Sequence, residues 1–424
     1  MNKKIGSYRV LTKCRFCSSK NLSNIIDLGL MPLAGAFIKD KNFTDEKLYP
    51  LNLLYCDDCS LVQVKEVISA DTLFKNNYFF FSSSIKTLVS HFEKYSIYLY
   101  ERFLIKKNNT ANVLEIGCND GVLLRPFTKL GIKPVGVDPA VNVVKNIKSK
   151  KCIIYNDYFT EELSMDILKK HNKFDLIISN FSFAHIDDMH DVMKGIVNLL
   201  SNDGVLAIEI YYLRNIVEEM NFDMIYHEHM SYYSLHTLIQ FFKLYRMEVF
   251  DVNHIKEVRS GSTRFFVKFS DNKKINITKN VKKVLSDEIK LKYNSSEIYN
   301  EYSKKILNSK IQTMDLIKKL KSNNKKIIGY GASGRGTIIM NYFGIDNKWI
   351  DFVIDDAPQK ENYYTPGNRV LIKNWKSLKK EDYPDYIVLF AWSFSDEIIK
   401  KRRDFIEMGG KFIVPLPSLR IIQK

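Results

Sequence analysis

Short apolar runs alternate with amphipathic stretches from residue 111 onwards. In "ANVLEIGCNDGVLLRPFTKLGIKPVGVDPA" (111–140) an apolar strand is followed by a glycine turn, a helix and a second strand. Further apolar strands are predicted in 151–159, 173–186 and 203–212, and a helical pattern separates the last two. Strands that alternate with helices indicate a parallel, doubly wound sheet. Ligands of such sheets bind at the carboxyl ends of the strands.

A second alternation follows a lysine-rich helical connector around residues 280–324. "KKIIGYGASGRGTIIMNYF" (325–343) predicts a strand, a glycine turn and a helix. Further strands are predicted in 349–358, 385–392 and 409–417. The C-terminal third therefore predicts a second α/β unit.

The N-terminal region holds four of the 6 cysteines in two close pairs. They are Cys14 and Cys17 in "CRFC", and Cys56 and Cys59 in "CDDC". Each pair can bind one metal ion from a tight turn, and four thiolates complete a closed tetrahedral zinc site. Such a site leaves no open position for chemistry, so we expect structural zinc rather than catalytic zinc or disulfides.

Together these patterns predict an α/β protein with two Rossmann-like, doubly wound domains and a small N-terminal zinc-binding module. We expect the zinc-binding module in residues 1–75. The central domain is expected in residues 76–270 and the C-terminal domain in 271–424.

Composition and charge narrow the range of partners. The 424 residues contain no apolar window of about 18 residues, which a membrane helix needs. The start, "MNKKIGSYRV", lacks the apolar stretch of a signal peptide, so we expect a cytoplasmic protein. The net charge of +16 has two readings, a solvated lysine-rich surface or an anionic partner. Because the basic residues are scattered along the chain, a phosphorylated small molecule is favoured over nucleic acid.

The first glycine turn predicts the kind of ligand that the central domain binds. It runs from Glu115 through Gly117 to Gly121 and lacks the glycine spacing of dinucleotide sites. Asp138 ends the next strand, where a carboxylate can bind both ribose hydroxyls, and Asp157 follows the third strand, within reach of an adenine. An adenosyl ligand without phosphates fits this pattern better than NAD does, with its carboxylate near the helix N-terminus.

These motifs carry a specific resemblance. "VLEIGCNDG", "GVDPA", "NDYF" and "FDLIISNFSFAHI" resemble the successive motifs of class I S-adenosylmethionine-dependent methyltransferases. With the four cysteines, "YHEH" and the C-terminal glycine turn, the chain resembles the methyltransferases that add a carbon branch to nucleotide-linked 4-keto deoxysugars. The resemblance implies S-adenosylmethionine, structural Zn²⁺ and a nucleotide-diphosphate sugar as ligands. It implies a cofactor site made by Glu115, Gly117, Asn119, Gly121, Asp138, Pro139, Asp157, Tyr158 and Asn180.

"MIYHEHMSYYS" (224–234) is unusually rich in proton-handling groups. If it formed a strand, His227 and His229 would share one face and could chelate a metal ion, although a third ligand is not evident beyond Glu228. Buried structural histidines are a second reading. We favour acid–base chemistry, because a ketone becomes a carbon nucleophile when a base removes the proton from the adjacent carbon.

The resemblance also implies individual roles in this chemistry. His229 resembles the general base, and Tyr226 and Glu228 match positions that line the same pocket. His185 matches a histidine near the methyl donor, and Tyr78 matches the first tyrosine of a loop that often has a second one. Here Phe80 replaces that second tyrosine.

The C-terminal glycine turn, "GYGASGRG", permits two readings. With Asp355 it matches a dinucleotide pattern, yet nothing nearby indicates hydride chemistry. The resemblance instead implies that Ser333, Gly334 and Arg335 contact the diphosphate of a sugar nucleotide. It also implies substrate contacts for Ser262 and Arg264 in "RSGSTR" (259–264), which departs from the family pattern at its first two residues.

The favoured function is therefore carbon methylation of a nucleotide-linked keto sugar through a base-generated enolate. Two alternatives keep the cofactor but change the acceptor, to a sugar hydroxyl or to RNA. RNA binding would show a steep salt dependence. A third alternative is a non-catalytic protein that binds sugar nucleotides, and the intact donor loop and "YHEH" oppose it.

Overall fold

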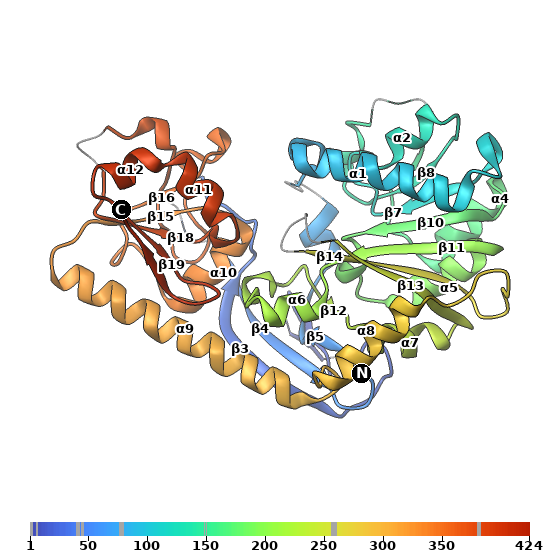
Figure 1. Ribbon diagram of the computed structural model, residues 1–424, viewed down its shortest axis with the longest axis horizontal. Helices are drawn as coiled ribbons and strands as arrows, with labels where there is room; N and C mark the ends of the chain where they lie inside the picture. The colour runs from blue at the N-terminus through green and yellow to red at the C-terminus, as the bar shows by residue number, and fades with distance from the viewer. Residues whose placement is uncertain are drawn as a thin grey trace.

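The computed structural model describes residues 3–5, 7–39, 43, 46–75, 80–147, 149, 151–255, 261–379 and 383–424. It consists of two α/β lobes, the central and C-terminal domains, with the strands of the N-terminal module between them (Figure 1). The predicted fold class is confirmed. Within the described part of the chain, none of the helices combines the length and apolarity needed to cross a bilayer.

The N-terminal module is built around an antiparallel hairpin that the sequence did not predict. Strand β3 (Leu22–Pro32) pairs with β4 (Leu48–Cys56), and β4 pairs with β5 (Val62–Val64). The edge strand next to β5 is β12 (Ser231–Tyr232), which comes from the central domain. The module therefore shares a sheet with the segment that contains the two neighbouring histidines. A smaller sheet joins β1 (Lys3–Ile5), β2 (Tyr8–Val10) and β6 (Glu66–Ile68).

The central domain has a mixed sheet with the strand order β9-β8-β7-β10-β11-β14-β13. The strands from β9 to β11 are parallel, as predicted, whereas β14 is antiparallel to both of its neighbours. The sequence pattern missed this last hairpin, because its strands follow one another without a helix between them. The bounds are β7 (Val113–Ile116), β8 (Val135–Val137), β9 (Ile153–Tyr155), β10 (Phe174–Asn180), β11 (Leu200–Ile210), β13 (Met247–Ile255) and β14 (Ser262–Phe269).

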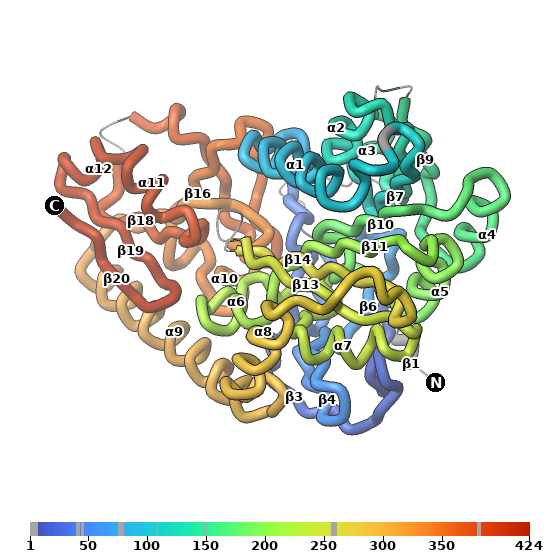
Figure 2. The backbone as a smooth tube through the Cα atoms, turned by 45° about the vertical axis from the view of Figure 1, so that its right-hand side comes forward, coloured from blue at the N-terminus to red at the C-terminus, as the bar shows by residue number. Residues whose placement is uncertain are grey.

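Helices cover both faces of this sheet (Figures 1 and 2). On one face, α1 and α2 pack on alternate strand residues such as Val113 and Ile178. On the other face, α4, α5 and α7 pack on Leu114 and Ile177, as the side-chain alternation of strands requires. The helices are α1 (Lys86–Leu99), α2 (Leu124–Lys129), α3 (Val141–Val144), α4 (Glu161–Lys170), α5 (Met189–Leu199), α6 (Leu213–Glu218), α7 (Leu235–Lys243) and α8 (Lys279–Lys290).

The long helix α9 (Ser296–Ser322) runs from the central lobe to the C-terminal lobe (Figure 1). The C-terminal sheet has the order β17-β16-β15-β18-β19-β20, with β20 antiparallel to β19 and the others parallel. Its bounds are β15 (Ile327–Tyr330), β16 (Val353–Ile354), β17 (Ile372–Lys373), β18 (Tyr386–Leu389), β19 (Lys411–Val414) and β20 (Arg420–Ile422), with α10 (Gly334–Phe343), α11 (Ser395–Lys401) and α12 (Arg403–Glu407).

Candidate active site

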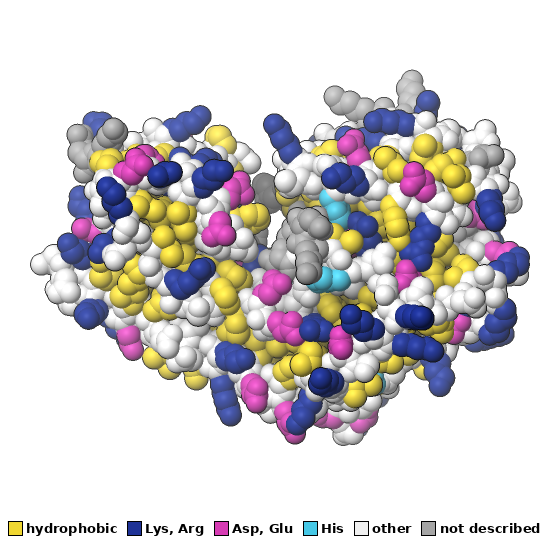
Figure 3. Space-filling view, viewed as in Figure 1, with side chains coloured by type: hydrophobic (Ala, Val, Ile, Leu, Met, Phe, Trp, Pro, Cys, Tyr) yellow, Lys and Arg dark blue, Asp and Glu magenta, His cyan; other side chains and the backbone are white. Residues whose placement is uncertain are grey.

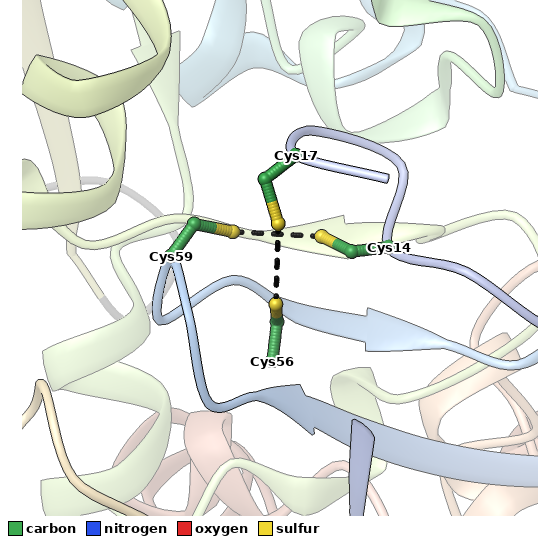
Figure 4. A group of neighbouring side chains, drawn as sticks. All are labelled: Cys14, Cys17, Cys56 and Cys59. Atoms are coloured by element: carbon green, nitrogen blue, oxygen red, sulfur yellow. Dashed lines mark hydrogen bonds between the residues drawn. The ribbon is translucent and has the colours of Figure 1, made fainter. Parts of the chain in front are cut away.

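The four paired cysteines converge on one point of the N-terminal module. Their sulfur atoms all lie within 4.8 Å of one another. Cys14 Sγ is 3.5 Å from Cys59 Sγ, and Cys17 Sγ is 3.5 Å from Cys56 Sγ, so both pairs contribute to one cluster (Figure 4). Four thiols at this spacing fit a closed tetrahedral zinc site. Among the described residues, this is the one group of histidine, cysteine or acidic side chains that meets the spacing of a metal site.

A cavity of about 1430 Å³ lies between the three parts of the chain. Leu33 and Phe37 of the N-terminal module line it, together with Gly117 of the central domain and Gly334 and Lys360 of the C-terminal domain. Figure 3 shows the notch between the two lobes, and Lys and Arg side chains are scattered over both of them on that face. The cavity reaches the carboxyl ends of the central strands, where the sequence predicted ligand binding.

The glycine turn after β7 forms the cofactor side of this cavity. Gly117 has φ +76°, and a Cβ atom there would lie 2.5 Å from Cβ of Ser182, so only glycine fits. Asp138 accepts hydrogen bonds from the backbone N–H of Asn119 at Oδ2 and from that of Ala140 at Oδ1, both at 2.9 Å. The carboxylate that the sequence predicted as the ribose ligand is thereby held at the cavity wall.

This part of the cavity is suited to a polar ligand, because several buried polar side-chain atoms in it have no hydrogen-bond partner. The side-chain amide of Asn180 has both its oxygen and its nitrogen buried and unpartnered, as is Oε2 of Glu115. Burial, followed by the charge of Asp138, raises the pKa of Glu115 well above its usual value. Unpaired groups of this kind are costly and match an adenosyl amino acid, which offers both donors and acceptors.

Of the predicted cofactor residues, Gly121 lies outside the cavity lining. It has φ +73°, so it shapes the turn, and a Cβ atom added there would lie 3.4 Å from the side chain of Ile147. Tyr158 donates a hydrogen bond to Asp71 Oδ1 at 3.1 Å, which joins the third strand's exit loop to the N-terminal module. The predicted residues that line the cavity are Glu115, Gly117, Asn119, Asp138, Pro139, Asp157, Tyr158 and Asn180.

His229 is buried and lines the same cavity. Its Nδ1 lies 2.8 Å from the backbone carbonyl of Met224, and its Nε2 lies 2.9 Å from Oη of Tyr226. Because a carbonyl only accepts, Nδ1 carries the proton and Nε2 keeps its lone pair. This tautomer, with its proton on Nδ1, leaves Nε2 able to accept a proton on the side of Tyr226, as a general base requires.

His185 and Glu228 complete this wall. The ring of His185 stacks on the rings of Phe74 and His229, at centroid distances of 5.5 and 5.1 Å. Burial lowers the pKa of His185 to about 4, so it is neutral near pH 7. Burial raises the pKa of Glu228 to about 7, so its carboxyl group titrates in the range where histidine does.

His227 is not among the described residues that line the cavity, and its segment does not form the strand on which the metal reading depended. Residues 222–224 are a single 3₁₀ turn, and turns and loop follow as far as residue 230. The Nε2–H of His227 donates to the carbonyl of Pro50 in β4 at 3.0 Å. Because His227 and His229 do not share a face, the chelate considered for them has no geometric support within the described residues.

The two predicted substrate residues of β14 belong to a buried polar network. Ser262 Oγ donates to Glu209 Oε1 at 2.6 Å, and Arg264 Nε donates to Oε2 at 2.8 Å. Burial raises the pKa of Glu209, but the hydrogen bond from His91 and the charge of Arg264 bring it below its usual value. Neither Ser262 nor Arg264 is among the described residues that line the cavity.

The C-terminal glycine turn contributes one predicted residue to the described cavity lining, Gly334. Ser333 caps α10, since its hydroxyl accepts the N–H of Gly336 at 3.1 Å. Arg335 donates through Nε and Nη2 to the carboxylate of Asp223, at 3.0 and 2.9 Å. The basic side chain at the cavity on this side is instead Lys360, which donates to the carbonyl of Ala332 at 2.7 Å.

The sequence did not predict two residues that surround His229, Tyr211 and Met224. A third residue, Tyr78, was predicted but is not described by the structure. Tyr211 lines the cavity with its ring centroid 5.7 Å from that of His229. Its position directly after the fifth predicted strand is the sequence feature that could have identified it. Met224 contributes a backbone carbonyl, which no feature of its side chain could have predicted. Tyr78 lies outside the described residues, whereas Phe80 lines the cavity.

Three protein families match the chain in succession. A zinc binding domain matches residues 14–74, a methyltransferase domain matches 90–249, and a C-methyltransferase C-terminal domain matches 257–417. C-methyltransferase NovU of Streptomyces niveus is 31% identical over 418 residues, which cover 98% of this chain and 97% of that protein.

More distant similarities are confined to part of the chain. Ubiquinone biosynthesis O-methyltransferase of Pelagibacter ubique is 30% identical over 105 residues, covering 24% of this chain and 43% of that protein. A solved S-adenosylmethionine-dependent methyltransferase of Clostridium acetobutylicum is 14% identical with a TM-score of 0.35, covering 42% of this chain and 92% of that one.

The similarity to the C-methyltransferase thus spans nearly all of both chains, in the same order as the three family matches. The cysteine cluster and the cofactor side of the cavity fit the two predicted ligands, Zn²⁺ and S-adenosylmethionine. The protein belongs to the C-methyltransferase family and is an S-adenosylmethionine-dependent methyltransferase with a zinc-binding N-terminal module.

Proposed function

We propose that the enzyme methylates the carbon next to the ketone of a nucleotide-linked 4-keto deoxysugar. The observation that carries the proposal is the pair of contacts of His229, a cavity-lining residue: Nδ1 lies on the Met224 carbonyl, which assigns it the proton and leaves Nε2, beside Tyr226, as the basic nitrogen of the neutral ring. A carbon acceptor needs such a base, because a C–H group becomes nucleophilic only when its proton is removed. The full-length similarity to a C-methyltransferase supports a carbon acceptor.

In this proposal His229 Nε2 takes the proton from the carbon beside the ketone. The electron pair of that C–H bond moves onto the carbonyl oxygen and forms an enolate. S-adenosylmethionine, when bound, would supply the electrophilic methyl group: the enolate carbon forms the new C–C bond as the S–CH₃ bond breaks, the ketone re-forms, and S-adenosylhomocysteine is the leaving group. At rest the Tyr226 hydroxyl donates to Nε2; when Nε2 takes the substrate proton instead, that hydroxyl is released to donate to the developing enolate oxygen. The proton on His229 then passes to solvent, which balances the reaction.

The three parts of the chain have separate tasks in this proposal. The module of residues 1–75 supplies the zinc site and the cavity floor, and the domain of residues 76–270 holds the methyl donor and the base. The domain of residues 271–424 holds the sugar nucleotide. Gly334 at the N-terminus of α10 and the Lys360 ammonium group line the cavity, and both suit an anionic diphosphate.

The test measures hydrogen exchange at the carbon beside the ketone. Unmodified enzyme in D₂O, with S-adenosylhomocysteine in place of the methyl donor, should exchange that hydrogen of a nucleotide 4-keto deoxysugar. His229→Asn should abolish both exchange and methylation while calorimetry still detects the cofactor. His171→Asn is the matched control, because His171 bonds Tyr155 at the end of α4. Near-normal exchange in His229→Asn would exclude His229 as the base.

A further inference from the structure

Asp223 lies where the central domain meets the C-terminal domain, and its side chain is 0% exposed. Its Oδ2 accepts from Arg335 Nε at 3.0 Å and from Trp392 Nε1 at 2.8 Å, and its Oδ1 accepts from Arg335 Nη2 at 2.9 Å. Arg335 Nη2 also donates to Asn221 Oδ1 at 2.7 Å. A forked guanidinium therefore neutralises a fully buried carboxylate across the domain boundary.

The turn that carries Asp223 also carries the carbonyl that orients the base. Residues 222–224 form one 3₁₀ turn, so Asp223 and the carbonyl of Met224 move together. That carbonyl accepts from His229 Nδ1 at 2.8 Å and from the Tyr232 hydroxyl at 3.1 Å. Phe222 stacks on Phe343 of α10 with ring centroids 5.8 Å apart. The turn is thus docked on the C-terminal domain by polar and apolar contacts at once.

We propose that Arg335 and Trp392 are positioning residues, which hold the Met224 carbonyl in place and thereby keep His229 in the tautomer with its lone pair at Nε2. This inference rests on the proposed function only in taking His229 as the base. If the turn shifts, Nδ1 loses its acceptor and the other tautomer, with its proton on Nε2, becomes accessible. His229 therefore keeps the tautomer of a base only while the C-terminal domain contacts the turn of residues 222–224.

The competing role for Arg335 is the one that the sequence favoured, a ligand of the substrate diphosphate. The two roles differ in whether a lysine can take the place of Arg335. A lysine ammonium binds phosphate as a point charge but cannot make the two parallel bonds that the Asp223 carboxylate receives. A phosphate ligand also affects KM for the sugar nucleotide, whereas a misplaced base lowers kcat.

The experiment compares Arg335→Lys, Asp223→Asn and the double variant in the full-length zinc-loaded enzyme. The matched control is Arg369→Gln, which breaks another ion pair of the C-terminal domain, that of Arg369 Nε with Glu46 Oε2 at 3.0 Å. The readouts are kcat, KM for the sugar nucleotide, exchange of the proton beside the ketone, and ¹⁵N NMR of the histidine tautomers without substrate.

Each single variant should lower kcat and exchange by about 100-fold, the scale of a misplacement near 1 Å. KM should stay close to that of the unmodified enzyme. The double variant should be no slower than the singles, because both remove one interaction. The Nδ1–H signature of His229 should weaken in all three and stay intact in Arg369→Gln.

Two results would overturn the inference. One is an unchanged His229 tautomer in both single variants, whatever their kcat. The other is a raised KM at unchanged kcat, which would make Arg335 a phosphate ligand. If Arg335→Lys or Asp223→Asn does not fold, Trp392→Phe removes one donor from Asp223, and the same readouts apply. The tautomer signal needs no substrate, so it decides this inference even if unmodified enzyme shows no exchange and the proposed function fails.

Discussion

The imidazole ring of His185 stacks on that of His229, with ring centroids 5.1 Å apart and planes 28° from parallel. His185 follows β10 on the cofactor side of the cavity, and His229 belongs to the loop before β12. The backbone supports the contact, since the N–H of Met230 donates to the carbonyl of Ala184 at 2.8 Å. The stack therefore joins the predicted cofactor side of the cavity to the loop that carries the proposed base.

The half-buried His185 should make the protein sensitive to acid. Its pKa is about 4 in the folded state, against an ordinary value of 6.5. Between these values the unfolded chain binds a proton that the folded protein does not, so the free energy of unfolding falls as the pH falls from 6.5 towards 4. The loss is at most about 3 kcal/mol. His185→Phe keeps the stacked ring, and urea unfolding at pH 7 and pH 5 should show a smaller loss for it. An equal loss in both proteins would contradict this.

Glu228 should change the free energy of unfolding with pH in the opposite direction to His185. Burial raises its pKa from 4.5 to about 7, so the folded protein holds a proton that the unfolded chain has already released. The free energy of unfolding should therefore fall as the pH rises from 4.5 through 7. The loss is below about 3 kcal/mol, because the side chain is partly exposed and solvent screens it. Glu228→Gln cannot ionise, so it should abolish this loss in urea unfolding at pH 5 and pH 8. A loss that persists in the Gln variant would assign it to another group.

Local patterns predicted the two main sheets and the cofactor side of the site. An apolar strand, a glycine turn and an acidic strand end occur within a few residues of one another, so Gly117 and Asp138 could be found without tertiary information. The antiparallel pairs β3–β4 and β13–β14 were missed because each strand follows its partner directly along the chain, without the intervening helix on which the predicted alternation depends.

The arrangement of residues around His229 could likewise be predicted only in part from the sequence. The segment around His229 was found by its composition, but its backbone was predicted as a possible strand and is a loop. Which histidine faces the cavity depends on the Pro50 carbonyl for His227 and on the Met224 carbonyl for His229. Backbone carbonyls have no signal in the sequence. Arg264 was predicted to contact the substrate, and in the structure it donates to the side-chain carboxylate of Glu209 on the neighbouring strand, a pairing that only the tertiary structure reveals.

Gly117→Ala should disrupt cofactor binding by a clash as well as by backbone strain. The new Cβ atom would lie 2.5 Å from Ser182 Cβ, and Ser182 in turn donates to the carbonyl of Ile116 at 2.8 Å. Gly344→Ala is the matched control, since Gly344 has φ +78° but nothing within 4 Å of the new Cβ. Both variants should lose about 1–3 kcal/mol of stability from the left-handed backbone. Only Gly117→Ala should lose S-adenosylmethionine binding in calorimetry, and equal affinities in the two variants would refute the clash.

The zinc cluster should stabilise the loop of the base as well as its own module. Cys56 ends β4, the strand whose Pro50 carbonyl binds His227, and β4 pairs with β5, which in turn pairs with β12 directly after His229. Loss of one thiolate opens the tetrahedral shell, and folding energy that the metal supplies is lost with it. Cys56→Ser should therefore lose its zinc in metal analysis, lower Tm and expose residues 46–75 and 225–234 to protease together. Cys152→Ser, outside the cluster, should keep zinc and Tm. Cleavage confined to the first of these segments would show that the base loop is held independently of the metal.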